Sequence, residues 1–235
     1  MKNRICYVVY TNSKCSDVWE MFIGQQKKYS DIPIYFISDK KVPGQESNTF
    51  LYEDNKPYYE SWVRALTEID FDFFIYLQED FILYDKVNQE KIYEYLNFLK
   101  NNEEYSFVRL LKSGNLNNVK VHNFLYEIEP YNNDIFSMQP TIWKKIDYIK
   151  IMQGTKNKIW LENNSYRNFM IQNNIKGLYH YDSEKKRGLN HYDSHVYPYI
   201  ATALIRGKWN ILEYSEELIP ITGYYNINLN KRGVF

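Results

Sequence analysis

The fold is decided by residues 5–39, which spell ICYVVYTNSKCSDVWEMFIGQQKKYSDIPIYFISD. Residues 5–10 and 32–38 are short, continuous apolar runs, which is the pattern of strands buried on both faces. Residues 17–28 between them carry apolar side chains at helical spacing. The order strand, helix, strand predicts a βαβ unit, in which the two strands are parallel and the crossover is right-handed.

The same alternation continues along the chain. We expect further helices at residues 58–69, 88–101, 141–152 and 164–173, and further strands at residues 73–77, 106–111, 136–140 and 177–181. The polar, Asn-rich section 112–133 predicts a hairpin or a loop insert, and the chain from residue 183 onward predicts an irregular polar tail. No internal repeat and no Gly- or Pro-rich linker divides the chain, so we expect one α/β domain with a mostly parallel central sheet flanked by helices.

Composition limits the partners. Lys plus Arg and Asp plus Glu each number 29, so the formal net charge is zero and nothing favours nucleic acid. The 24 Tyr and 13 Phe offer flat faces suited to sugars and bases, although an AT-rich genome produces the same surplus. Cys6 and Cys15 show neither a disulfide framework nor metal-ligand spacing. We therefore expect a cytoplasmic protein with free thiols, without a signal peptide or a transmembrane segment.

The acidic motif lies at the end of the predicted strand 73–77. Its aromatic, apolar run stops at Gln78, Glu79 and Asp80, and apolar residues resume directly afterwards. Adjacent acids at the end of a buried strand need a counter-charge, and a divalent cation that also binds phosphate supplies one. The alternative is a strand that ends at the surface with two solvated acids.

Polar side chains follow the first two predicted strands as well. Thr11 and Asn12 come after the first strand, and Asp39 comes after the second. Ligands bind outside the carboxyl ends of the strands of an open sheet, so these residues and the acidic motif predict one polar rim. Thr11 and Asn12, which precede a helix, favour a phosphate there, and Asp39 is placed to accept hydrogen bonds from a ribose or a base. Ordinary turn, cap or loop chemistry is the alternative for all three residues.

A further carboxylate stands beside a tryptophan. In Trp160-Leu161-Glu162, desolvation would raise the pKa of the Glu162 carboxyl, which suits a general base acting on a hydroxyl group. The alternative is a core tryptophan next to a glutamate that favours a helix N-terminus. Arg64, on the helix before the acidic motif, would approach a phosphate from the side unless it is simply solvated.

Histidines and basic residues near the C-terminus complete the candidates. His191 and His195 flank an aspartate, and one of them would complete the coordination of a cation held by Asp80. The pattern favours the alternative of hydrogen-bonded loop histidines. The segments 206–208 and 231–233 combine cations with a glycine, which lets the backbone and a cation approach a phosphate together. They predict closure over a diphosphate, with a solvated tail as the alternative.

These motifs together resemble the small bacterial and viral glycosyltransferases of the GT-A fold. The resemblance covers nearly the whole chain, and its carriers are Leu77-Gln78-Glu79-Asp80 as an x-E-D form of the D-x-D motif, residues 137–143, Trp160-Leu161-Glu162 and residues 206–210. It implies a single Rossmann-like GT-A domain over residues 1–235. Residues 1–111 would then bind the nucleotide sugar and the metal, residues 112–182 would face the acceptor, and residues 183–235 would close the site.

The resemblance also implies a reaction. A sugar would move from a nucleoside-diphosphate sugar, with a UDP-sugar expected, to a hydroxyl of a glycan or glycolipid acceptor, with inversion and with help from Mn²⁺ or Mg²⁺. Asp80 would bind the metal, with His195 as a second ligand, and Glu162 would be the base. The remaining donor contacts would come from Tyr10, Thr11, Asn12, Asp39, Arg64, Gln78, Glu79, Arg206 and Lys208. Gln78 stands where the D-x-D motif has its first Asp, which leaves fewer charges at the metal.

Two other functions are compatible with the same motifs. A nucleotidyltransferase uses a similar sheet and metal, but a glycine-rich basic loop after the first strand is typical of such enzymes, and this chain has Thr11-Asn12-Ser13-Lys14 there. A catalytically inactive carbohydrate-binding module is favoured by the missing first Asp and by the aromatic surplus. For the glycosyltransferase we expect a cytoplasmic location, with peripheral attachment to a membrane as the alternative.

Overall fold

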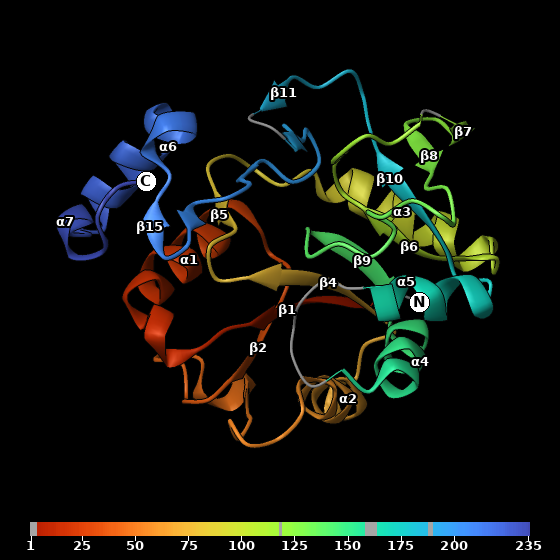
Figure 1. The fold of residues 1–235 in the computed structure, drawn as a ribbon. Coiled ribbons are helices and arrows are strands. Elements are labelled where there is room, and N and C mark those ends of the chain that lie inside the picture. The colour runs from red at the N-terminus through yellow and green to blue at the C-terminus, as the bar shows by residue number, and fades with distance from the viewer. Residues whose placement is uncertain (1–3, 118, 158–163, 188–189) are drawn as a thin grey trace.

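A nine-stranded sheet with the order β3-β2-β1-β4-β9-β6-β10-β8-β7 forms the centre of the molecule (Figure 1). The computed structural model describes residues 4–117, 119–157, 164–187 and 190–235. The strands of this sheet are β1 (Ile5–Tyr10), β2 (Ile34–Ser38), β3 (Thr49–Leu51), β4 (Phe73–Gln78), β6 (Tyr105–Arg109), β7 (Val119–His122), β8 (Leu125–Glu127), β9 (Thr141–Lys144) and β10 (Lys176–His180).

The strand directions confirm the expected fold class. β1 lies between β2 and β4 and is parallel to both, and β6 is parallel to β10. Only β9 and β8 run against the other strands of this sheet, because each is antiparallel to its two neighbours. The chain is therefore a mixed α/β protein whose central sheet is mostly parallel, as in a Rossmann-like nucleotide-binding domain.

Helices cover the sheet on two sides. The described α-helices are α1 (Ser16–Tyr29), α2 (Tyr58–Glu68), α3 (Gln89–Asn101), α4 (Lys145–Thr155), α5 (Asn164–Gln172), α6 (Ile211–Tyr224) and α7 (Leu229–Arg232), of which α6 and α7 lie beside the C-terminal strands rather than on the central sheet. Figure 1 shows α2 and α4 on one side of β4 and α3 on the other. Trp62 of α2 and Tyr148 of α4 both pack on Phe74 of β4, with ring centroids 5.8 and 5.1 Å from it. No helix in the described part of the chain is long and apolar enough to span a bilayer.

α3 illustrates how the sequence specifies a helix locally. Asn88 caps its first turn, since the side chain accepts a hydrogen bond from the backbone N–H of Lys91 at 3.1 Å. Ile92, Tyr95 and Leu99 recur at helical spacing and are all buried. The predicted boundaries of this helix and of α1, α2 and α5 agree with the structure to within about two residues, which is the usual uncertainty of helix ends.

One predicted strand is displaced. We expected a strand at 136–140 and a helix from residue 141, but the strand is β9 (Thr141–Lys144) and α4 begins after it. Trp143 and its neighbours fill the space between β4 and β6, pairing antiparallel with both strands. The conformation of this segment depends on its pairing with a strand on each side. The periodicity of a short sequence segment contains no information about such pairing.

The C-terminal segment is not the irregular tail that we expected. It contains α6, α7 and short two-residue strands, including the hairpin of β14 (Leu204–Ile205) and β15 (Lys208–Trp209). Pro220 breaks the helical pattern of the sequence over α6. The helix itself is kinked at Tyr214, whose backbone dihedrals are not helical. The expected hairpin within 112–133 is present as β7 and β8, and it extends the edge of the central sheet.

Candidate functional site

A cleft of about 400 Å³ lies at the carboxyl ends of β1 and β4. The parallel register places Tyr10 opposite Gln78, so the polar residues that follow the two strands reach the same edge of the sheet. The C-terminal segment forms the opposite wall. The cleft is lined by Tyr10, Thr11, Asn12, Cys15, Gln78, Glu79, Asp80, Leu204, Arg206, Gly207 and Arg232.

Asp80 has an unusual protonation equilibrium. The pKa of its carboxyl is raised to about 7, first by burial and then by the neighbouring charge of Glu79. The backbone N–H of Leu204 and the Arg232 cation act in the opposite direction. The carboxyl therefore lacks a sufficient counter-charge at neutral pH. A bound cation would lower this pKa, because it favours the ionised form.

Glu79 is held by donors from the loop after β1. Burial raises the pKa of its carboxyl, while hydrogen bonds from Cys15 and Thr11 oppose that shift. Thr11 in turn accepts a hydrogen bond from the indole N–H of Trp19 at 2.8 Å, which fixes its hydroxyl toward the acid. Burial and the charge of Glu79 raise the pKa of the Cys15 thiol to about 12, so Cys15 is a protonated donor and not a nucleophile.

Tyr10 forms an aromatic wall of the cleft. Its ring is stacked on Tyr52, with centroids 5.2 Å apart and planes 7° apart, and on Trp62 at 6.0 Å and 17°. Trp62 is stacked in turn on Tyr76 of β4 at 5.4 Å. Because the half-buried Tyr10 ring is stacked on both Tyr52 and Trp62, packing holds it in one orientation beside the cleft.

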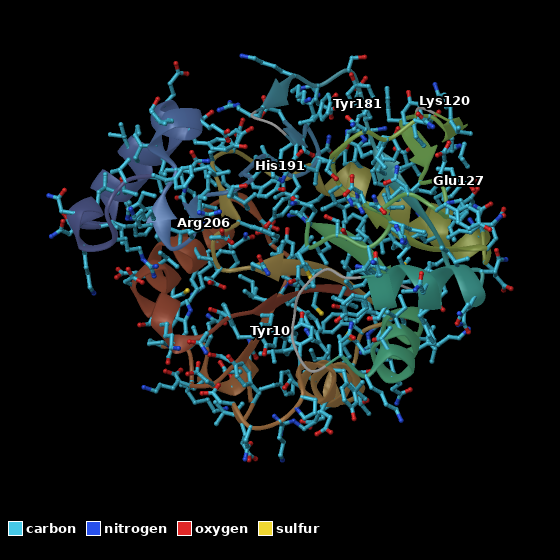
Figure 2. The ribbon with its side chains drawn as sticks, viewed as in Figure 1. Tyr10, Lys120, Glu127, Tyr181, His191 and Arg206 are labelled. Carbon is cyan, nitrogen blue, oxygen red and sulfur yellow. The ribbon has the colours of Figure 1, made fainter. Side chains whose placement is uncertain are left out.

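Two arginines reach the cleft from the C-terminal segment. Arg206 and Gly207 form the two-residue turn between β14 and β15, with positive φ angles of 51° and 79°. Positive φ at both positions is the type I′ geometry that suits tight hairpins, and it presents Arg206 at the exposed tip. Figure 2 shows Arg206 beside the C-terminal helices and Tyr10 near the centre of the sheet.

Arg232 is the second cation, and it links the C-terminal segment to the N-terminal part of the chain. Its Nε donates to the Asp17 carboxylate at 2.7 Å and a terminal nitrogen forms a second bond to the same group, a bidentate pair between α7 and the start of α1. A terminal nitrogen also donates to the carbonyl of Gly207 at 3.4 Å. The half-buried guanidinium is thus fixed at the edge of the cleft.

Several predicted site residues meet in this cleft. Tyr10, Thr11, Asn12, Gln78, Glu79, Asp80 and Arg206 all line it. Asn12 is already engaged, because its amide donates to the Tyr52 hydroxyl at 2.9 Å and its carbonyl accepts from the Lys14 N–H at 3.0 Å. Asn12 therefore orients Tyr52 and the turn after β1, which makes its role in the resting protein one of capping.

Other predicted residues lie outside the lining of the cleft. Asp39 accepts hydrogen bonds from the backbone N–H and the hydroxyl of Ser13, each at 2.6 Å, so it holds the turn after β1. Arg64 is exposed in a smaller hollow with Glu53 and Glu60. Lys208 is exposed on β15, two residues beyond the hairpin tip.

His195 lies in a different hollow from Asp80. The His195 side chain is 70% exposed and lines a different hollow, where its Nδ1 lies 3.8 Å from a Glu184 oxygen. The structure therefore does not bring His195 beside Asp80, because the Glu184 contact and the pairing of Asn88 with Val196 hold its loop elsewhere. Glu162, the predicted base, lies outside the described residues.

No sequence motif predicted the roles of Cys15 and Leu204, which line the cleft, or of Tyr52, which supports Tyr10 from outside the lining. Tyr52 follows β3, a strand of three residues that carries too few positions for periodicity to reveal. Leu204 contributes its backbone N–H to Asp80, which leaves no side-chain signature. Arg232 did carry a signal, since it belongs to the basic segment 231–233 beside a glycine.

The residues present fit a divalent cation only in part. Among the described residues, no three His, Cys, Asp or Glu side chains gather in a group able to hold a metal ion. Asp80 is an oxygen donor of the kind that Mg²⁺ and Mn²⁺ prefer, and ions that use one or two carboxylates take their other ligands from water and substrate phosphates. Asp80 therefore suits a cation that arrives with a phosphorylated substrate.

Comparison with known proteins leaves the reaction open. No family model and no curated protein matches the sequence. Among solved structures, a cytidylyltransferase from Leptospira borgpetersenii is 12% identical over 99% of each chain, with a TM-score of 0.46. A TarS fragment from S. aureus is 14% identical over 74% of this chain and 60% of its own, with a TM-score of 0.41. An active-site mutant of LgtC is 11% identical over 73% and 71%, with a TM-score of 0.39.

Proposed function

We propose that the protein is a glycosyltransferase that moves a sugar from a nucleoside-diphosphate sugar to a hydroxyl of a glycan or glycolipid acceptor, with inversion. One observation carries this proposal: a single cleft joins the acids at the end of β4 to two arginines of the C-terminal segment. Acids suit a cation, and arginines suit a diphosphate. The half-buried ring of Tyr10 in the lining of the cleft suits contact with the base of the nucleotide, for which uracil is the first candidate.

The diphosphate leaving group sets the main chemical requirement of this site. When the bond between the sugar and the diphosphate breaks, negative charge develops on the phosphate oxygens, and fixed cations lower the barrier by stabilising that charge. Arg206 and Arg232 would provide this stabilisation from the wall formed by the C-terminal segment. Glu79, held by Thr11 and Cys15, would face the sugar.

Asp80 would hold Mn²⁺ or Mg²⁺ through its carboxylate. The bound ion would neutralise charge on the diphosphate. Asp39, Arg64 and Lys208 are not among the proposed donor contacts, and His195 is not a proposed metal ligand, because all four lie outside the lining of the cleft. Glu162 stays a prediction for the base.

A donor panel tests the proposal. The protein is incubated with Mn²⁺ and with UDP-, GDP-, ADP- and CDP-sugars, and released nucleoside diphosphate is measured. We expect slow hydrolysis of one donor, and we expect the Asp80→Ala variant to lose it. Release of pyrophosphate from a nucleoside triphosphate and a sugar phosphate would instead identify a nucleotidyltransferase. Glycan binding without any turnover would identify a binding module.

The two cations of the β14–β15 hairpin provide a second prediction. We expect Arg206→Ala to weaken binding of the nucleoside diphosphate about 10-fold to 100-fold, the worth of a charge-assisted hydrogen bond. Lys208→Ala, which removes an equal charge outside the lining, should change the affinity less than about twofold, because solvated charges contribute little. Titration calorimetry at two salt concentrations measures both variants. Equal losses would show that only the net charge of the hairpin matters.

A further inference from the structure

A hydrogen-bonded row of side chains leads away from the acidic motif. Tyr199 belongs to β13 (Tyr199–Ile200), which pairs antiparallel with β5 (Ile82–Leu83), the short strand just after Asp80. The Tyr199 ring packs edge-on against Phe81, with centroids 5.2 Å apart. Tyr199 is buried, and the charge of Asp80 acts on its phenol.

Gln139 is the second member of the row. It lies in the bend just before β9, whose first residue, Thr141, pairs with Tyr76 of β4. The hydroxyl of Tyr199 donates to Oε1 of Gln139. This bond fixes the amide orientation, and the Nε2 of Gln139 therefore points in the other direction.

The Nε2 of Gln139 is hydrogen-bonded to His191 of β12 (His191–Tyr192), at 3.0 Å from Nε2 of the imidazole. An amide nitrogen only donates, so Nε2 of His191 must accept and the ring must be neutral with its proton on Nδ1. His191, labelled in Figure 2, is half-buried, so solvent reaches part of the ring. A neutral imidazole with a basic ring nitrogen is what a general base requires.

Charged groups on the neighbouring elements favour this neutral form. Burial lowers the pKa of His191, and the Arg109 cation of β6 lowers it further, while the Glu213 carboxylate of α6 opposes them. Arg187 pairs with His191 through the backbone, and its guanidinium is engaged by Asp193 and Glu217. The ring is thus unprotonated over most of the physiological range.

We propose that Nε2 of His191 is the base that activates the acceptor, with Gln139 and Tyr199 as positioning residues. The inference rests on the proposed glycosyltransferase function and offers a different base from Glu162. The acceptor hydroxyl replaces the Gln139 amide at Nε2 and gives up its proton there. Its oxygen forms the new bond to the anomeric carbon, and the bond from that carbon to the diphosphate breaks with its electron pair. The imidazolium then returns the proton to water.

Donor hydrolysis tests the role, with water as the acceptor and the donor that the panel identifies. We expect His191→Gln to lower the hydrolysis rate about 100-fold to 10,000-fold, the usual contribution of a general base. Binding of Mn²⁺ and the nucleoside diphosphate should stay unchanged, and added imidazole should restore part of the rate. His122→Gln, at an exposed histidine of β7, is the matched control.

The Gln139→Leu variant tests whether Gln139 acts on the protonation of His191, because a purely structural role would leave the pH dependence of the hydrolysis rate unchanged. The Gln139 amide stabilises the neutral ring, so its loss should raise the pKa of His191 and shift the acidic limb of the pH-rate profile to higher pH. An unshifted limb, or a His191→Gln variant with the wild-type rate, would overturn the assignment, and loss of the limb in Glu162→Gln instead would give the role to Glu162. A wild-type protein that neither binds nor cleaves any donor would overturn the proposed function itself and this inference with it.

Discussion

Asp80→Asn is expected to lower donor turnover about 1,000-fold, because charge stabilisation worth several kcal/mol is lost with the metal ligand. Asparagine keeps the size of the side chain and the hydrogen bond from the Leu204 N–H, and it removes only the negative charge. Binding of the nucleoside diphosphate should lose its dependence on Mn²⁺, which calorimetry with and without the ion measures. Asp85→Asn, an exposed aspartate after β5, is the matched control.

The same substitution should stabilise the folded protein at alkaline pH. The pKa of Asp80 is raised from 3.8 to about 7 in the folded state, so the native protein binds more protons than the unfolded chain between these values and stability falls as the pH rises through them. We expect Asp80→Asn to gain about 1–3 kcal/mol in unfolding free energy at pH 8 and almost nothing at pH 4. Urea unfolding in metal-free buffer measures both values. A loss of stability at pH 8 would show that the charge of Asp80 is well compensated.

Trp62→Ala is expected to cost about 3–5 kcal/mol of unfolding free energy, the usual penalty for removing a buried aromatic side chain. Trp62 is fully buried and stands in the middle of the column that runs from Tyr76 to Tyr10. Its loss opens a cavity that the rigid sheet on one side is unable to fill. Chemical denaturation measures the change.

A second variant and a binding measurement separate the loss of stability from an effect on nucleotide binding in the cleft. Trp62→Phe keeps part of the column and should cost only about 1–2 kcal/mol, with nucleotide affinity close to that of the wild type. In Trp62→Ala, Tyr10 loses its stacking partner at 6.0 Å, and we expect weaker nucleotide binding even where the variant is fully folded. Unchanged binding in that variant would mean that Tyr52 alone orients Tyr10.

The parallel half of the sheet was predictable from the sequence because its signals are local. The strands β1, β2 and β4 are continuous apolar runs, and the helix between the first two has a clear apolar face. β9 was misplaced by a few residues because its conformation depends on β4 and β6, two strands far away in the sequence. The tail was missed because Pro220 and the kink at Tyr214 hide the helix.

The candidate site also contains residues that were predictable from the sequence and residues that were not. Thr11, Asn12, Glu79 and Asp80 follow strands whose parallel pairing is predictable, so their convergence was predictable too. Asp39 follows its strand as expected, but its carboxylate accepts hydrogen bonds from Ser13, a contact that depends on the conformation of a turn. His195 was linked to Asp80 by residue type alone, and residue type carries no information about distance in space.

The pair formed by Arg232 and Asp17 also has a consequence for biosynthesis. The two residues are 215 positions apart in the chain, and the cleft that they border contains Tyr10 from the first strand. While the chain is being made on a ribosome, β1, α1 and the acids of β4 emerge long before the arginines that face them. The nascent protein therefore has no complete cleft until residue 232 has left the ribosome, so an incomplete translation product would lack the second cation of the site.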